Sequence, residues 1–327
     1  MISVIIPVYN SAPYLEDCLR SISEQSYPDW ECLIVDDASI DESRAICKTW
    51  CTKDRRFNLL NEGHNGAAHA RNLGLAKARG DFVAFIDSDD YVTPSYLESL
   101  LHAISTKNSD LAVGGIVRKL LSGKMMVARP EDDVIFQLNN SNVDRFFSLC
   151  EKNLLYGPFA KLYRNALIKA NNIQFDERYS YGEDLIFNVR YLRVVDTIST
   201  TDVCSYYYLS HEHDTLSTRF RKDLFKTDYE QWKELRSLFM DKGLLEETIA
   251  KQYLYKRLWG FVYDGIFLFP KLENPSAQYL NEILSIPEVD EMGKYASLFS
   301  CSKWIKIAIL HRWSSVFHLY FKLFSRR

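Results

Sequence analysis

The sequence lacks the features that would mark a nucleic-acid-binding, secreted or membrane-spanning protein. Its formal net charge is only −3 over 327 residues, so no global field favours a nucleic-acid partner. Met1 is not followed by a basic and apolar leader, so no secretory signal is expected. The seven cysteines show no paired spacing. Cys47 and Cys51 would share one helix face, but no second pair completes a zinc site. We therefore expect reduced thiols and a cytoplasmic location.

Glycine-rich phosphate loops are also missing. The first predicted strand is followed by Pro7-Val8-Tyr9-Asn10, with no Gly-x-Gly-x-x-Gly and no Walker loop. This excludes the usual dinucleotide-binding and P-loop motifs. A diphosphate pocket without such a loop needs a metal ion and basic side chains to neutralise its ligand. Arg71, in a helix predicted to begin after Asn65-Gly66, is a candidate for this task.

The first hundred residues alternate between strand and helix patterns at short spacing. Continuous apolar runs predict strands at 3–6, 31–35, 57–60 and 82–86, and 3.6-residue periodicity predicts helices at 14–25, 42–50 and 65–80. This pattern is typical of an α/β sheet with helices on both faces. Ligands of such sheets bind beyond the carboxyl ends of the strands.

Polar residues follow three of these predicted strands: Pro7 to Asn10, Asp36 to Ser39, and Asp87 to Asp90. Carboxylates directly after a buried strand are costly unless they face solvent or a cation. Alternately spaced aspartates suit Mg²⁺ or Mn²⁺ when the ion's other partner is a diphosphate. The alternative is a turn in which Asp89, Asp90 or Thr93 caps a helix near Pro94. Three polar strand ends at one edge favour a ligand site.

Together these motifs resemble a family 2 glycosyltransferase with the GT-A fold, of the bacterial surface polysaccharide type. The resemblance covers about residues 1–210 and consists of six segments in order: VIIPVYN at 4–10, VDDAS at 35–39, ARNLGL at 70–75, DSDD at 87–90, KLYR at 161–164 and GEDL at 182–185. It implies a mostly parallel twisted sheet flanked by helices. The implied catalytic domain is 1–215, with a nucleotide-sugar half at 1–115 and an acceptor half at 116–215. A helical region, 216–327, follows.

The resemblance also implies a role for each motif residue. Asp37 would accept a hydrogen bond from the uracil N3–H, and Asp184 would be the general base. A metal ion would be held by Asp89 and Asp87. The implied donor-binding residues are Pro7, Val8, Asn10, Asp37, Arg71, Asp87 and Ser88. The chain departs from the usual family residues Gly, Thr, Asn and Ser at Ala38, Ile40, His64 and Ala68.

Asp184 precedes a helical pattern, so its alternative role is that of a helix N-terminal carboxylate favoured by the dipole. A single base opposite the leaving diphosphate predicts displacement with inversion, unlike hydrolysis by two flanking carboxylates. Further contacts to the acceptor or the diphosphate are expected from Lys161, Glu183, His211 and His213. The alternatives are a solvated lysine for Lys161 and a surface loop for the two histidines.

From about Phe220 the pattern is persistently helical and aromatic. Its last segment carries no Asp or Glu but six basic residues, namely Lys303, Lys306, Arg312, Lys322, Arg326 and Arg327. These charges interrupt every apolar stretch before it reaches the ~20 residues that span a bilayer. The segment therefore predicts a basic, aromatic helix in the interface of an anionic membrane. The alternative is a helix packed on the domain or on a second subunit.

The sequence thus predicts an inverting, Mn²⁺- or Mg²⁺-dependent transferase. It would move a hexose from a UDP-sugar to a glycan or lipid-linked glycan in bacterial surface polysaccharide or lipooligosaccharide synthesis. We expect it in the cytoplasm, peripheral on the inner face of the membrane, with a homo-oligomer left open. The alternatives are a sugar-1-phosphate nucleotidyltransferase and a non-catalytic sugar-nucleotide-binding protein at the membrane.

Overall fold

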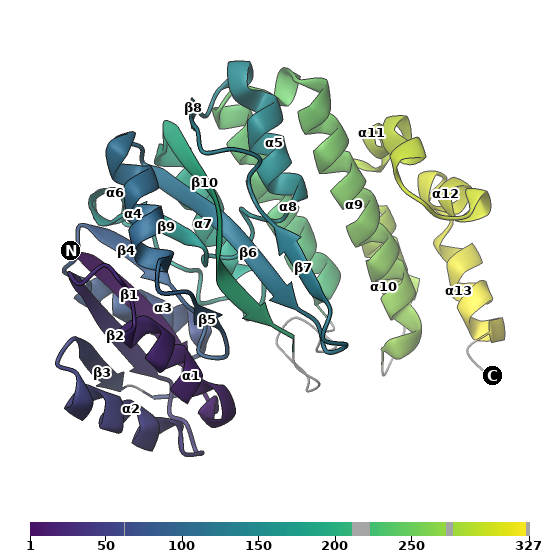
Figure 1. Ribbon diagram of the computed structural model, residues 1–327. Helices are drawn as coiled ribbons and strands as arrows, with labels where there is room; N and C mark the ends of the chain where they lie inside the picture. Colours follow the sequence, from purple (N-terminus) through teal and green to yellow (C-terminus); the bar gives the residue numbers. More distant parts are fainter. Residues whose placement is uncertain (62, 211–222, 273–276, 325–327) are drawn as a thin grey trace. The chain divides into compact units, whose positions relative to one another are not determined.

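The computed structural model describes residues 1–61, 63–210, 223–272 and 277–324. The chain forms two compact units, Met1–Arg219 and Phe220–Arg327. The described strands all belong to the first unit and form one ten-stranded sheet (Figure 1). The strands are β1 (Ile2–Val8), β2 (Trp30–Asp36), β3 (Phe57–Asn61), β4 (Phe82–Phe85), β5 (Tyr91–Val92), β6 (Leu111–Lys119), β7 (Met125–Ala128), β8 (Ile135–Gln137), β9 (Lys161–Arg164) and β10 (Thr197–Leu209).

The strand order is β3-β2-β1-β4-β9-β6-β10-β5, with β7 beside β6 and β8 beside β10. The neighbours β3, β2, β1 and β4 are parallel. β9 is antiparallel to both β4 and β6, and β10 is parallel to β6. Because two antiparallel steps restore the direction, β6 and β10 point the same way as β1 and β4. Their carboxyl ends therefore lie at one edge of the sheet.

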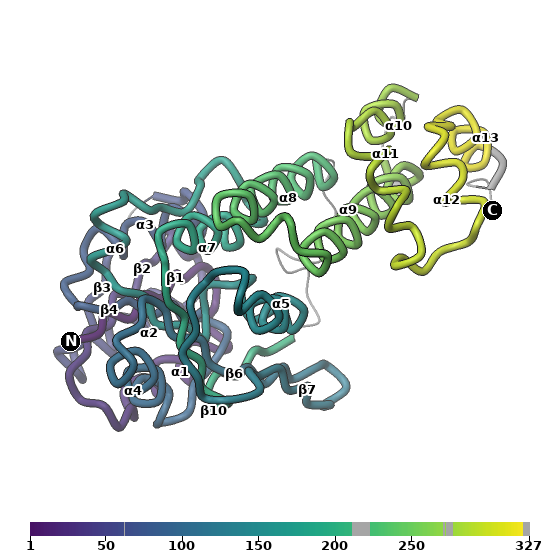
Figure 2. The backbone as a smooth tube through the Cα atoms, turned by 90° about the horizontal axis from the view of Figure 1, so that it is seen from above, coloured from purple at the N-terminus to yellow at the C-terminus, as the bar shows by residue number. Residues whose placement is uncertain are grey.

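Helices cover both faces of this sheet, with α3, α6 and α7 on one side and α1 and α4 on the other (Figure 2). The helices of the first unit are α1 (Ala12–Ser23), α2 (Ser43–Lys53), α3 (Ala67–Lys77), α4 (Tyr96–Thr106), α5 (Val143–Glu151), α6 (Asn165–Ala170), α7 (Glu183–Val194) and the 3₁₀ turn η1 (Asn140–Asn142). Burial on both faces explains why β1 and β2 read as continuous apolar runs. The seven elements predicted in this region are all present, as β1, α1, β2, α2, β3, α3 and β4.

The second unit is helical among its described residues. Its helices are α8 (Leu224–Asp241), η2 (Leu244–Glu246), α9 (Thr248–Leu268), η3 (Phe269–Lys271), α10 (Ala277–Leu284), α11 (Val289–Met292), η4 (Gly293–Leu298), α12 (Lys303–Leu310) and α13 (Ser314–Phe324). Buried indoles tie them together: Trp232 Nε1 donates to the carbonyl of Leu254 and Trp259 Nε1 to that of Met292, each at 2.8 Å. Such bonds satisfy the polar end of a large apolar side chain.

The last segment differs from the prediction of one terminal helix. It forms two helices, α12 and α13, separated at Arg312, whose φ of 56° lies in the left-handed region. Arg312 Nη1 donates to the carbonyl of Leu284 at 2.6 Å, so its side chain fixes the turn between the helices. In the part of the chain that the structure describes, no helix is long and apolar enough to cross a membrane.

Candidate active site

The ends of β1 and β2 are joined by hydrogen bonds between the residues that follow them. The amide of Asp37 donates to the carbonyl of Val8 at 2.9 Å. The side chain of Asn10 accepts from the amide of Ile40 at 2.9 Å, and the amide of Asn10 donates to Ser39 Oγ at 3.1 Å. These bonds bring two of the expected polar strand ends together. Pro7 and Val8 lie at the end of β1, at the same edge.

The end of β4 joins the same edge through serine side chains. Ser88 is buried, and its Oγ lies 2.6 Å from Ser11 Oγ at the start of α1. The amide of Ile86 donates to the carbonyl of Ile5 at 3.1 Å. The three polar strand ends predicted from sequence are therefore neighbours in the structure.

Asp37 anchors the beginning of α3. Its carboxylate is buried and accepts hydrogen bonds from the amides of Asn65 and Gly66, at 2.7 and 2.9 Å. The sequence assigned this carboxylate to a nucleobase, and the structure adds a second task, because these amides are unpaired donors of the helix N-terminus. A carboxylate with about four acceptor sites can serve both.

Two stacked rings beside Asp37 were not predicted from the sequence. His64 stacks on Tyr9 with ring centroids 4.3 Å apart, and its Nδ1 lies 2.9 Å from Asp37 Oδ2. Tyr9 belongs to the motif after β1, and His64 is one of the departures from the usual family residues. Those two facts were the only signal in the sequence. A second departure, Ala38, has a φ of 60°, which is a conformation that favours glycine.

Arg71 on α3 is the centre of the site. It is 5% exposed, and its Nη2 donates to Asp87 Oδ1 at 2.8 Å. Its Nη1 lies 3.4 Å from Glu183 Oε1 and 3.2 Å from Asp184 Oδ1. One guanidinium therefore joins the acidic motif after β4 to the first turn of α7. The sequence assigned Arg71 to a diphosphate, whereas two of its nitrogens are directed at carboxylates of the protein.

Asp184 lies at the N-terminus of α7, directly after Gly182, whose φ is 82°, and Glu183. Its side chain is 28% exposed. Burial, against the opposing charge of Arg71 and together with the charges of Glu183 and Asp87, raises the pKa of Asp184 to about 8. A partly exposed carboxyl whose pKa lies near neutrality has the properties of a general base. Asp184 thus has the helix N-terminal position of the alternative interpretation, and its role as the general base stays a prediction.

The three aspartates after β4 have different surroundings. Asp90 is buried, accepts from the hydroxyl of Tyr206 at 2.6 Å and accepts from the amide of Leu209 at 2.9 Å. Burial raises the pKa of Asp90 well above its usual range, and the charges of Asp89 and Asp87 add to the shift. The hydroxyl of Tyr206 also accepts from the amide of Asp87 at 3.2 Å. Tyr206, which the sequence analysis did not identify, therefore links Asp87 and Asp90 to β10.

The helix-cap interpretation of these aspartates is wrong. The residue at the N-cap of α4 is Ser95, and the side chain that accepts from an amide of the first turn is Gln25, whose Oε1 lies 2.9 Å from the amide nitrogen of Leu97. The metal interpretation requires oxygen donors. Among the described residues no cluster of three His, Cys, Asp or Glu side chains could hold an ion by itself. Asp87 and Asp89 supply hard carboxylate oxygens, a donor set that fits Mg²⁺ or Mn²⁺ when water and phosphate oxygens complete the coordination.

Lys161 is not the solvated lysine that the sequence left as an alternative. It is 1% exposed, and its Nζ donates to the carbonyls of Gly157 and Phe159 at 2.6 and 3.2 Å. Burial lowers its pKa to about 7, with the charge of Asp184 opposing the shift. Asn188 on α7 donates to the carbonyl of Gly157 as well, at 3.0 Å. Lys161 thus fixes the loop before β9 close to Asp184. His211 and His213 lie outside the described residues.

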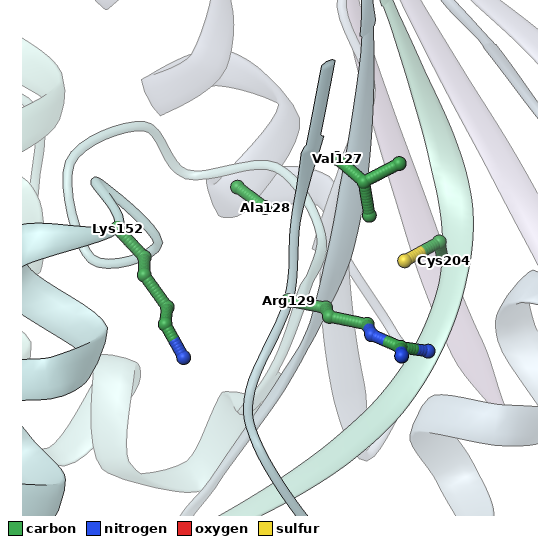
Figure 3. A pocket seen from close by; sticks show the side chains of 5 residues that line it. All are labelled: Val127, Ala128, Arg129, Lys152 and Cys204. Carbon is green, nitrogen blue, oxygen red and sulfur yellow. The ribbon is translucent and has the colours of Figure 1, made fainter. Parts of the chain in front are cut away.

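A cavity of about 750 Å³ lies elsewhere in the first unit, lined by Val127, Ala128, Arg129, Lys152 and Cys204 (Figure 3). It contains none of the residues expected from sequence. Its two cations have acidic neighbours, since Lys152 lies 3.0 Å from Glu131 and Arg129 lies 3.7 Å from Asp202. We assign this cavity no part in the site.

The fold and the acidic strand ends define a glycosyltransferase with the GT-A fold. The chain belongs to glycosyl transferase family 2, whose family model matches residues 3–170. The alternatives of a nucleotidyltransferase and a non-catalytic binding protein do not stand, because this is a family of glycosyltransferases.

Relatives with more specific names are also similar to this chain. Poly(ribitol-phosphate) beta-N-acetylglucosaminyltransferase TarS of Staphylococcus aureus is 31% identical over 300 residues, covering 88% of this chain and 50% of TarS. Poly(ribitol-phosphate) beta-glucosyltransferase of Bacillus spizizenii is 30% identical over 214 residues, covering 64% of this chain and 32% of the relative. This chain thus spans half or less of the length of these two relatives.

Among solved structures, S. aureus TarS 1–349 in complex with UDP-GlcNAc is similar with a TM-score of 0.70 and 24% identity. The likeness covers 98% of this chain and 91% of that one. At this identity the likeness establishes the fold alone. It extends over the helical second unit as well as the sheet.

Proposed function

We propose that this chain is an inverting, metal-dependent glycosyltransferase that moves a hexose from a UDP-sugar to a glycan or lipid-linked glycan acceptor. The observation that carries the proposal is the position of Arg71 between Asp87 and Asp184. Asp87, one of the two proposed metal carboxylates, and Asp184, the proposed base, thus contact one cation, which supports their acting on a single substrate. Carboxylates on unconnected surfaces could not act on one anomeric carbon.

The donor proposal is supported by two findings. Asp37, with Tyr9 and His64 beside it, lies at the strand edge where sheets of this class bind ligands. TarS, whose fold this chain shares, is described in complex with UDP-GlcNAc. The acceptor proposal is supported by the relatives named above, which act on poly(ribitol-phosphate) by their names. We infer a role in bacterial surface polysaccharide or lipooligosaccharide synthesis.

The proposed reaction is one displacement. The acceptor hydroxyl oxygen attacks the anomeric carbon, the bond from that carbon to the diphosphate oxygen breaks, and the hydroxyl proton passes to Asp184. Asp87 and Asp89 would hold Mg²⁺ or Mn²⁺, which when bound supplies Lewis-acid stabilisation of the charge on the departing diphosphate. Arg71 contacts Asp184 Oδ1 at 3.2 Å and so orients the carboxylate. The 28% exposure of that side chain leaves it open to an acceptor.

The cytoplasmic location remains part of the proposal. All seven cysteines are free thiols in the structure, which supports a reducing compartment. Lys161 and Glu183 act in this proposal as structural supports of the base, since both are buried and Glu183 contacts Arg71.

The test is a donor screen with purified protein. UDP-sugars and GDP-sugars are incubated with Mn²⁺ and candidate acceptors, and free nucleotide is measured. We expect UDP release that depends on a UDP-sugar, on metal and on acceptor, and a product of inverted anomeric configuration by NMR. Release from GDP-sugars alone would contradict the donor, and a retained configuration would contradict the single-base displacement.

A further inference from the structure

The last two helices of the second unit expose apolar side chains on their outward surfaces. We call these residues the α12–α13 apolar face: Trp304, Ile307, Trp313, Val316 and Leu319. Each is between 37% and 57% exposed. Single exposed apolar residues are common on soluble proteins. Five exposed apolar residues occur within sixteen successive residues, counted from Trp304 to Leu319, on two helices that are in contact through Trp304 and Tyr320. A concentration of this kind is typical of an interaction surface.

The residues of this face are not needed to fill the core of the second unit. The opposite sides of the helices are buried, with Ile305 and Ile309 on α12 and Phe317 and Phe321 on α13. Since the core already has these anchors, the exposed residues are an additional surface. The ring of Trp304 lies 5.9 Å from that of Phe317 and so connects the two helices.

Lysines accompany the apolar residues at helical spacing. Lys303 precedes Ile307 by four positions, and Lys322 follows Leu319 by three, so each lysine lies on the same side of its helix as its apolar neighbour. From Ser302 to Arg327 the sequence has no Asp or Glu. The surface is not free of acidic neighbours, because Asp290 of α11 lies 3.3 Å from Arg312, but the segment itself combines tryptophan, aliphatic side chains and lysine. Such a segment complements an anionic lipid headgroup layer.

The two helices are too short to cross a bilayer, so they could only lie on its surface. α12 has 8 residues and α13 has 11. At the α-helical rise they are about 12 and about 16 Å long, well short of the ~30 Å hydrocarbon core. We propose that the α12–α13 apolar face docks this chain on the surface of an anionic lipid bilayer, with its tryptophans at headgroup depth. The proposal goes beyond sugar transfer and does not depend on it.

The test is co-sedimentation of the full chain with vesicles. We expect binding to vesicles of phosphatidylglycerol and phosphatidylcholine that weakens with added salt, and little binding to phosphatidylcholine alone. The triple variant Lys303→Gln/Lys306→Gln/Lys322→Gln should bind on the order of a hundredfold more weakly. The matched control replaces three lysines elsewhere in the same unit, Lys226→Gln/Lys242→Gln/Lys256→Gln, and should bind as the wild type does.

A second pair of variants tests the apolar part. Val316→Ser/Leu319→Ser should lose about tenfold or more in binding, whereas Met240→Ser, an exposed apolar residue of α8, should lose none. Thermal unfolding of every variant shows whether weaker binding comes from the changed surface or from loss of the folded structure. Wild-type protein that stays in the supernatant with anionic vesicles, or equal losses in both lysine triples, would overturn the proposal. So would a dimer that Val316→Ser/Leu319→Ser dissociates while lipid binding persists, since the face would then belong to a second copy.

Discussion

The parallel side of the sheet and its mixed side contribute different things to the candidate site. On the parallel side, Asp37 follows β2, and Asp87 and Asp89 follow β4. The mixed side supplies groups that fix the segments around the site: Tyr206 on β10 accepts from the amide of Asp87, and Lys161 on β9 donates to the carbonyl of Gly157. The chemistry therefore comes from short local motifs, and its geometry comes from residues about a hundred positions later in the chain. Substitutions of the carboxylates should change turnover or metal dependence, whereas a substitution on the mixed side should change the free energy of unfolding.

The largest effect should come from Asp184, the proposed base at the start of α7. We expect Asp184→Asn to lower turnover by roughly 10²–10⁴-fold, the usual contribution of general base catalysis, and to leave donor binding intact. Turnover is measured as nucleotide release and donor binding by calorimetry. Asp202→Asn, an exposed carboxylate on β10, is the control. Turnover near the wild-type value would remove Asp184 from the base role.

Asp89 and Asp90 provide a comparison between adjacent residues of the same type. In Asp89→Ala, UDP affinity measured in Mn²⁺ should fall to the value measured without metal, because a proposed ligand is lost. Asp90→Asn should keep the metal dependence, since Asp90 is buried against Tyr206 and Leu209. Calorimetric titrations of both variants with UDP decide the matter. A metal-dependent affinity that survives in Asp89→Ala would refute the assignment.

The pH profile follows from the raised pKa of Asp184. The base acts in its ionised form, and burial raises its pKa to about 8. The value of kcat/KM should therefore rise with pH toward a plateau above about 8, and below it should drop about tenfold for each pH unit. The measurement is kcat/KM of the wild type from acidic to alkaline buffers. A profile that falls across this range would be inconsistent with an ionised Asp184 as the base.

Tyr206 tests the supporting side of the sheet. Tyr206→Phe removes the hydroxyl that donates to Asp90 and accepts from the amide of Asp87. Leaving these buried groups unpaired should cost about 1–3 kcal/mol in the free energy of unfolding. Denaturant titration gives this value, with Tyr207→Phe as the control because its hydroxyl makes neither bond. Equal losses in the two variants would mean that the Tyr206 hydroxyl supports nothing of its own.

The smallest effect should come from Ala38, which has a φ of 60°, a conformation that favours glycine. Ala38→Gly relieves left-handed strain of roughly 1–2 kcal/mol but gains entropy in the unfolded chain, so we expect a net stabilisation of about 0.5 kcal/mol. Ala170→Gly at the end of α6 should instead destabilise by up to about 1 kcal/mol. Denaturant titration distinguishes the signs. A loss of stability in Ala38→Gly would contradict the strain argument.

The sequence predicted the elements that a local residue pattern determines and missed those that depend on contacts with distant residues. β1 and β2 were predicted because burial on both faces makes a strand apolar throughout its length. The two-residue strand β5 was not, because it exists only by pairing with Tyr206 and Tyr207 of β10. The turn that divides the last segment was missed for a similar reason, since Arg312 is held there by the carbonyl of Leu284.

The candidate site shows the same limit. Sequence placed Asp87, Asp89 and Asp184 as candidates, and the structure brings Asp87 and Asp184 to one guanidinium. Sequence could not show that Asp90 is buried, because the residue whose hydroxyl contacts it, Tyr206, lies 116 positions away. Nor could it show that Lys161 is buried, since the groups that hold it are backbone carbonyls, which carry no sequence signal.

The short helix α3 contacts two parts of the candidate site. The amide at its N-terminus donates a hydrogen bond to Asp37, and Arg71 on the same helix contacts Asp87 and Asp184. Eleven residues of continuous helix thus join the proposed nucleotide contact to the neighbour of the proposed base. Under the proposed function, this connection predicts an ordered mechanism in which the donor enters first.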